Sequence, residues 1–229
     1  MTKPSDISVL GAQVDNAVSR SSIRLTTQRV GHRFGERVLF KRMDLSFMGG
    51  HSMAITGANG SGKSTLVRIL AGLMQPTKGT VLLSVDGQEI DPELRPLSSG
   101  LVAPYLNVYQ GFTPRENLQF IAQARGMGRA HPRIQEVLET VQIDMRADDQ
   151  VGTFSSGMLQ RVKIACALLP DPPVLFLDEP SATLDVDGVA MTRRVIAKAL
   201  EDGRIVIVAT NEPDEAEACE GKIAIEDYQ

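Results

Sequence analysis

Residues 57–65 read Gly57-Ala58-Asn59-Gly60-Ser61-Gly62-Lys63-Ser64-Thr65, which fits the pattern G-x-x-x-x-G-K-[ST]. A strand-like run, Ser52–Thr56, precedes this stretch, and helical apolar spacing follows it from Ser64 to Met74. Glycines let a backbone wrap a phosphate with its N–H groups pointing inward, and a helix N-terminus adds partial positive charge. In such a loop Lys63 reaches the β- and γ-phosphates, and the Ser64 hydroxyl completes a Mg²⁺ shell. We therefore predict a phosphate-binding loop (P-loop) whose binding residues are Gly57, Asn59, Gly60, Ser61, Gly62, Lys63, Ser64 and Thr65.

Two adjacent acids end a second predicted strand. The buried-type run Val174–Leu177 leads directly into Asp178 and Glu179. Asp178 at the end of the strand can hold Mg²⁺, partly through water, and Glu179 can accept a proton from an attacking water molecule. Two acids before Pro180 could instead solvate a turn. Beside a P-loop, they indicate a metal ligand at Asp178 and a general base at Glu179.

The other elements alternate between strand and helix. This order of strand, glycine turn, helix and strand is typical of a parallel α/β sheet. We expect strands at Ile23–Val30, Met43–Met48, Thr80–Val85, Ile205–Ala209 and Lys222–Glu226, and helices at Ser156–Leu169 and Val189–Glu201.

The middle of the chain is helical. Thr113-Pro114-Arg115-Glu116 is a capping box with proline at the first helical position, and it predicts a helix that ends near Gly126. A second helix is predicted over Pro132–Val141, and no strand pattern occurs between Tyr105 and Thr153. We interpret residues 104–158 as a helical insertion.

Composition excludes two classes of function. Lys plus Arg total 24 against 28 for Asp plus Glu, giving a formal charge of −4, so the chain lacks the basic excess of a general nucleic-acid binder. Ten aromatic residues are too few for a base-stacking platform. No apolar run approaches the roughly 18 residues that span a bilayer. Cys166 and Cys219 are predicted to be small core residues in a reducing cytoplasm, and residues 1–21 a flexible tail without a signal peptide.

A third motif completes the pattern. Phe154-Ser155-Ser156-Gly157-Met158 opens a helix, and its hydroxyls and amides form a second anion-binding surface. With this motif, residues 22–229 resemble the nucleotide-binding subunit of ABC transporters. The resemblance implies an α/β P-loop NTPase fold with a RecA-like parallel-sheet core (22–103 and 159–229). It also implies an N-terminal antiparallel β subdomain and an inserted helical subdomain at about 104–158.

The resemblance implies an ATP site shared between two subunits. ATP and Mg²⁺ would lie between the P-loop of one copy and Ser155, Ser156 and Gly157 of the other, with Asp185 in the D-loop, residues 181–185. Phe34 resembles the aromatic residue that stacks on adenine, although a core Phe at a strand edge is the alternative. The subunit would be a dimer, a homodimer in the simplest case. It would sit on the cytoplasmic face of the membrane against a permease that the insertion and residues 104–113 contact.

Three positions depart from the family pattern. The signature reads Phe154-Ser155-Ser156-Gly157-Met158 rather than Leu-Ser-Gly-Gly-Gln. Tyr105 stands where a Gln is expected; it either presents its hydroxyl to a Mg²⁺-bound water or is a plain loop aromatic. Asn211 replaces the switch histidine, so it can donate a neutral hydrogen bond to the γ-phosphate but carries no charge. Losing a charge-assisted bond costs about 1.5–3 kcal/mol, roughly 10- to 100-fold in rate. We therefore expect slow or partner-dependent hydrolysis with Glu179 as the base.

Three functions stay open from the sequence. The first is the ATPase subunit of a transporter, with export as the expected direction. The second is an ABC ATPase that serves a non-transport assembly process. The third is a regulatory dimer that binds ATP with little hydrolysis, which Asn211 and Tyr105 favour and Lys63, Asp178 and Glu179 oppose.

Overall fold

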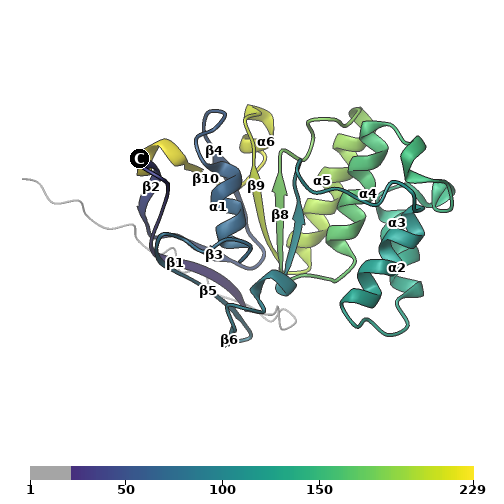
Figure 1. The fold of residues 1–229 in the computed structure, drawn as a ribbon, viewed down its shortest axis with the longest axis horizontal. Coiled ribbons are helices and arrows are strands. Elements are labelled where there is room, and N and C mark those ends of the chain that lie inside the picture. Colours follow the sequence, from purple (N-terminus) through teal and green to yellow (C-terminus); the bar gives the residue numbers. More distant parts are fainter. Residues whose placement is uncertain (1–21) are drawn as a thin grey trace, which may run out of the picture.

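An antiparallel sheet forms one side of the computed structural model, which describes residues 22–229 (Figure 1). The predicted tail, residues 1–21, lies outside the described residues. The sheet has the order β2-β1-β5-β6, and β3 also pairs with β1. Its strands are β1 (Ile23–Phe34), β2 (Arg37–Met43), β3 (Ser46–Met48), β5 (Lys78–Val85) and β6 (Gln88–Ile90).

A parallel sheet of order β10-β4-β9-β8-β7 forms the centre of the molecule. Its strands are β4 (Ser52–Thr56), β7 (Ser99–Val102), β8 (Val174–Asp178), β9 (Ile205–Ala209) and β10 (Gly221–Ala224). All its pairs run parallel, so the carboxyl ends of β4, β9 and β8 meet at one edge. In an open α/β sheet, ligands bind at this edge.

Alternation along the central strands divides the interior into two cores. Val174 and Phe176 of β8 pack with helix α1 (Lys63–Leu70) and the antiparallel sheet. Leu175 and Leu177 pack on the other face, against the remaining long helices. Those helices are α2 (Pro114–Ala124), α3 (His131–Thr140), α4 (Ser156–Leu168) and α5 (Val186–Glu201). Because both faces of the sheet are covered, β8 and β9 consist of apolar runs without polar alternation.

The helical middle of the chain follows the sequence closely. Thr113 and Glu116 form both hydrogen bonds of the predicted capping box at the start of α2. Arg133 and Glu136 pair at 2.8 Å on α3. In the described chain no strand lies between β7 and β8. Helices α2 and α3 both fall inside the predicted insertion, whose boundaries 104–158 stay a prediction.

Several element boundaries differ from the expectations. Arg37–Met43 forms β2, which the sequence analysis missed because exposed cations at positions 37, 41 and 42 hide its buried residues. The expected strand 43–48 is divided, because Met43 is the last residue of β2 and Ser46–Met48 forms β3. Helix α1 ends at Leu70, because Gly72 turns the chain with a φ of +83°. The last strand stops at Ala224, and Ile225–Tyr228 forms a 3₁₀ turn.

Between residues 22 and 229, no helix combines the length and the apolar character needed to cross a membrane. The acidic stretch after β9 contains the short helix α6 (Pro213–Glu217).

Candidate nucleotide site

The P-loop connects β4 to α1 in a conformation that requires glycine. Gly57, Gly60 and Gly62 have φ values of +145°, +77° and +120°, in the region that side chains rarely adopt. A Cβ on Gly57 would lie 2.7 Å from Ser61 Oγ. The Ser61 N–H donates to the Ala58 carbonyl at 3.1 Å, which closes the turn ahead of α1. The loop therefore holds the wrapped shape that the motif predicts.

Lys63 connects the three strand ends at this edge. Its side chain is only 6% exposed, and Nζ donates to the Gly57 carbonyl at 2.8 Å and to Asn211 Oδ1 at 2.5 Å. Glu179 Oε1 lies 3.9 Å from the same nitrogen. One ammonium group thus contacts the P-loop, the residue that follows β8 and the segment that follows β9.

Asn211 occupies the position expected for a histidine and has partners at both ends of its amide. Oδ1 accepts from Lys63, and Nδ2 donates to Asn59 Oδ1 in the P-loop. In an amide the oxygen accepts and the nitrogen donates. Asn211 therefore bridges the end of β9 to two P-loop side chains.

Asp178 is a buried carboxylate without a hydrogen-bond partner in the described chain. The residue is 1% exposed, and neither oxygen is paired. Burial raises the pKa of Asp178, and the nearby Ser64 hydroxyl and the charges of Lys63 and Arg68 oppose that rise. An unpaired buried carboxylate is costly, and a cation relieves the cost.

The oxygen atoms of Asp178 and Ser64 are suitable ligands for Mg²⁺. Among residues 22–229, no group of three or more His, Cys, Asp and Glu side chains is arranged to hold a metal. Mg²⁺ does not need such a cage, because it binds through one or two protein oxygens together with substrate phosphates and water. Asp178 and Ser64 supply oxygens of that kind.

Glu179 follows Asp178 in a left-handed conformation with a φ of +50°. Its N–H donates to the Ala209 carbonyl at 2.8 Å, which fixes this turn against β9. Burial raises the pKa of the Glu179 carboxyl, while Lys63 and the Asn211 backbone N–H lower it. A non-glycine residue with positive φ is strained, and such strain is concentrated at functional sites. The turn leaves the carboxylate partly exposed.

Phe34 lies at the tip of the β1–β2 hairpin with 53% of its surface exposed. It is therefore not a core residue, which removes the alternative left open by the sequence. Its cross-strand partner, Arg37, donates to the Gly60 carbonyl at 3.0 Å and so ties the hairpin to the P-loop. This places an exposed aromatic ring beside the loop.

Tyr105 contacts α1 rather than standing alone in a loop. The Arg68 guanidinium lies 3.8 Å from the centre of the Tyr105 ring. Arg68 is also one of the charges that lower the pKa of Asp178. Tyr105 is thus connected to Asp178 through a cation on the P-loop helix.

The signature segment, residues 154–158, lies apart from the P-loop. Ser155 caps α4 by accepting the Met158 N–H at 3.3 Å, and a Cβ on Gly157 would lie 3.2 Å from the Thr183 carbonyl. Asp185 caps α5 through the Gly188 N–H at 2.8 Å. Within the described chain, no hydrogen bond or ion pair joins residues 155–157 to residues 57–65. The structure therefore gathers the P-loop, Asp178, Glu179 and Asn211, and leaves the signature beside the D-loop.

Comparison with known proteins identifies the family. Residues 40–182, more than half of the chain, match the model described as "ABC transporter". The chain belongs to the ABC transporter family. It is 32% identical over 205 residues to a Nod factor export ATP-binding protein I of Burkholderia lata, covering 87% of this chain and 67% of that protein. It is 31% identical to a probable anion import ATP-binding protein of Haloferax volcanii, covering 92% of this chain and 79% of that protein.

Solved structures agree with the family. A dimeric post-hydrolysis structure of the ATP-binding cassette MJ0796, bound to ADP and Pi, matches with a TM-score of 0.75 and 26% identity. The match covers 87% of this chain and 93% of that chain. The chain is thus an ABC ATPase with the α/β P-loop fold that the sequence predicts. It spans 61–67% of the length of three Nod factor export relatives.

Four contacts of this ABC cassette were not foreseen from the sequence. Two involve residues close in sequence to a motif. Arg68, which contacts the Tyr105 ring, lies one helical turn after Ser64, and Gln160 follows the signature by two positions. Gln160 Nε2 donates to the Pro180 carbonyl at 3.0 Å. The others join distant segments. Arg161 pairs with Asp185 at 3.4 Å, and Glu226 Oε1 accepts the Ala58 N–H at 2.8 Å.

Proposed function

We propose that this chain binds and hydrolyses ATP as a dimer and drives conformational change in a separate membrane permease, in the direction of export. The observation that carries the proposal is the meeting of Lys63, Asp178, Glu179 and Asn211 at one sheet edge. The Nod factor export relatives support export. The anion import relative makes import the competing direction.

Each residue has a distinct role in this proposal. Phe34 stacks on adenine, while the P-loop amides and Lys63 bind the phosphates. Asp178 and Ser64 hold Mg²⁺, which when bound neutralises phosphate charge. Glu179 accepts the proton of the attacking water, since its carboxylate is partly exposed beside Lys63. Asn211 holds Lys63 in place and offers a neutral amide in place of the imidazole.

A second copy would complete the site. Ser155, Ser156 and Gly157 have amides and hydroxyls at the start of α4, yet they make no hydrogen bond to the P-loop of their own chain in the part that the structure describes. A dimer packed head to tail would bring these groups to the phosphates of the partner's site. The dimeric cassettes among the structural relatives support this arrangement.

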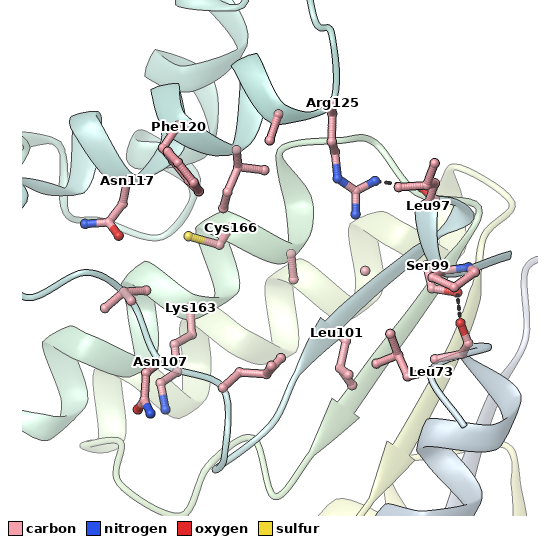
Figure 2. Close-up of a pocket in the computed structure, with 18 of the residues that line it drawn as sticks. Leu73, Leu97, Ser99, Leu101, Asn107, Asn117, Phe120, Arg125, Lys163 and Cys166 are labelled. Atoms are coloured by element: carbon pink, nitrogen blue, oxygen red, sulfur yellow. Dashed lines mark hydrogen bonds between the residues drawn. The ribbon is translucent and has the colours of Figure 1, made fainter. Parts of the chain in front are cut away.

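An apolar groove supports the proposal of a membrane partner. A cavity of about 490 Å³ lies between α2, α4 and the segment after β7. Figure 2 shows Phe120 of α2, Lys163 and Cys166 of α4, and Leu97 and Leu101 around it. The groove includes Leu106–Tyr109, which fall in the segment predicted to meet a permease. Apolar grooves rimmed by polar groups are interaction sites. We propose that a cytoplasmic segment of the permease docks here.

A regulatory dimer with little hydrolysis is the second candidate. The specific observation in its favour is Asn211, whose amide is already bonded at both ends to Asn59 and Lys63. A soluble assembly partner in the same groove is the third. Both alternatives are consistent with an ABC ATPase, and the experiments below distinguish each of them from the transporter function.

A Glu179→Gln variant tests the assignment of the base. The amide keeps the shape of the carboxylate but cannot accept the proton, so phosphate release should fall by about 10²- to 10⁴-fold. ATP should still bind, and size-exclusion chromatography with ATP should show a trapped dimer. If wild type hydrolyses ATP readily and the variant is equally fast, the role of Glu179 is overturned. If wild type, even with its partner, is as slow as the variant is expected to be, the regulatory dimer is favoured.

A Phe120→Asp variant tests the groove. Phe120 is 46% exposed on the groove wall, so the change should leave the fold and the basal ATPase intact while an added charge prevents apolar docking. A co-purified polytopic membrane protein should be lost. Met145→Asp, at a side chain that is 91% exposed and outside the groove, is the matched control. A soluble protein in place of the membrane protein would support the assembly function instead.

A further inference from the structure

A basic pocket lies in the antiparallel sheet, at the end where β1, β2 and β5 meet. Its cavity measures about 430 Å³, within the range of small-ligand sites. Five cationic side chains line it together with a histidine: Arg29, Arg33, Lys41, Arg42, Lys78 and His32. None of the residues that line this pocket is Asp or Glu. All charged side chains that line the pocket are therefore basic.

The side chains of these cations form no ion pair with a carboxylate in the described part of the chain, although the Arg29 backbone N–H donates to Asp44 Oδ1 at 2.7 Å. None of the five takes part in an ion pair, although seven other Lys and Arg side chains do. The one side-chain hydrogen bond among them joins Arg33 to the Gly35 carbonyl at 3.2 Å. The chain as a whole carries a charge of −4, so this cluster runs against its average. Clustered like charges repel, and a bound anion removes that repulsion.

His32 gives an independent indication of a ligand. It is only 9% exposed, and its Nδ1 lies 3.3 Å from Thr77 Oγ1. Its Nε2 is buried and has no hydrogen-bond partner among the described residues. Buried polar nitrogens are normally paired, so an unpaired one in a pocket wall needs an explanation. A ligand oxygen or an ordered water bound with it would supply the missing partner.

The pocket is separate from the ATP site. No P-loop residue lines it. Phe34 and Arg37 pair across the hairpin, and Arg37 reaches the P-loop. The adjacent pair, Arg33 and Val38, lines the pocket; because side chains alternate along a strand, this pair faces the opposite side of the hairpin. The His32 ring nevertheless lies 4.8 Å from the Phe34 ring, which connects the two sites.

We propose that this pocket binds a phosphate-bearing polyanion, either a free small molecule or the headgroup of an anionic phospholipid. Guanidinium groups present paired N–H donors that match the oxygens of a phosphate, and Lys41 and Lys78 add point charges from β2 and β5. His32 Nε2 contacts the same group from the buried wall. Occupation would press on the edge of Phe34 and so alter the adenine side of the ATP site.

Two probes distinguish a free small molecule from a lipid headgroup as the ligand. With the P-loop saturated by a non-hydrolysable ATP analogue in excess Mg²⁺, inorganic tripolyphosphate is titrated by calorimetry. In the second arm, vesicles of phosphatidylglycerol or of phosphatidylcholine are sedimented with the protein. We expect wild type to bind tripolyphosphate, phosphatidylglycerol or both, but not phosphatidylcholine, with affinity that falls as salt rises. Tripolyphosphate alone indicates a soluble ligand, and vesicles alone indicate a headgroup.

The Lys41→Gln/Lys78→Gln variant removes one positive charge from each of two strands. It should weaken anion binding by about tenfold, because each exposed lysine–phosphate ion pair contributes only part of the binding affinity. Arg24→Gln is the control, because Arg24 is an exposed β1 cation outside the pocket. Melting temperatures and ATP-analogue binding equal to wild type establish that both variants fold. If the double variant does not fold, Arg33→Gln replaces it. Absence of binding to either probe, or equal loss in the Arg24 control, would overturn the proposal. Failure of ATP hydrolysis would not, because neither arm measures it.

Discussion

Asn211 places a neutral amide at the position where the family pattern has a histidine. Its amide accepts from Lys63 and donates to Asn59, so it fixes the end of β9 to the P-loop without any charge. The ammonium of Lys63 is consequently held by neutral oxygens, with Glu179 at 3.9 Å as the nearby carboxylate. A neutral amide stabilises developing charge on a phosphate less than an imidazolium does.

An Asn211→His variant should therefore hydrolyse ATP faster. A charge-assisted bond is worth about 1–1.5 kcal/mol more than a neutral one, which corresponds to roughly a 5- to 10-fold gain in turnover. Phosphate release at saturating ATP measures the gain. Asn211→Ala is the matched control and should be slower than wild type, because alanine offers the γ-phosphate no hydrogen-bond donor. A histidine variant no faster than wild type would show that Asn211 does not limit the rate.

The residues predicted from the sequence are those whose neighbours in the chain carry the signal. Lys63 and Ser64 follow the glycines, and Asp178 and Glu179 end an apolar strand, so local spacing was sufficient. Glu226 contacts the P-loop from 168 residues away, through the parallel pairing of β10 with β4. Nothing near Glu226 in the sequence indicates that contact, because register between distant strands is set by the whole sheet.

At the scale of elements, the junction of β1 and β5 depends on one glycine. The pairing slips between Gln28 and Gly31, and Arg29 takes a φ of +48° at this irregularity. Gly79 lies opposite with a φ of +82°, and a Cβ there would lie 2.4 Å from the Gln28 carbonyl oxygen. The backbone of β1 thus approaches too closely for any side chain on Gly79.

A Gly79→Ala variant should lose about 3 kcal/mol of stability or more, since both the φ value and the backbone contact oppose a Cβ. For a chain of this size, that loss lowers the melting temperature by about 6–12 °C, measured by circular dichroism. Gly35→Ala is the control: its φ is +57°, and no atom lies within 4 Å of its Cβ. It should cost only about 1–2 kcal/mol. Equal shifts in the two variants would show that the close approach is not energetically important.

The elements that the sequence predicted well are those with one dominant pattern. Strands β8 and β9 are buried on both faces and read as continuous apolar runs, and α2 begins at its capping box. Strand β2 was missed because Arg37, Lys41 and Arg42 interrupt its apolar residues. Three of its positions pair with β1 at or beside register shifts, so tertiary pairing decided its conformation.

At the scale of the whole molecule, the parallel sheet separates the P-loop from the signature segment. One face supports α1 and the antiparallel sheet, which carry the P-loop and Phe34. The other face supports α2–α5, which carry the signature segment and the groove of Figure 2. The signature segment is tied to the D-loop through Arg161 and Asp185. The P-loop and the signature segment, the two proposed halves of an ATP site, therefore lie at places that no hydrogen bond or ion pair joins among residues 22–229.

Mixing two inactive variants tests whether those halves meet between chains. Lys63→Ala disables the P-loop, and Ser155→Phe blocks the signature with a bulky ring, so each pure homodimer should be inactive. A mixed dimer contains one site with an intact P-loop from one chain and an intact signature from the other. Random pairing then predicts phosphate release of about a quarter of the wild-type rate, because half the dimers carry one good site out of two. A mixture as inactive as its components would place the complete site within a single chain. Thr140 is an exposed residue of α3 outside both segments, so Thr140→Phe should retain full activity and would show that a surface ring is itself harmless.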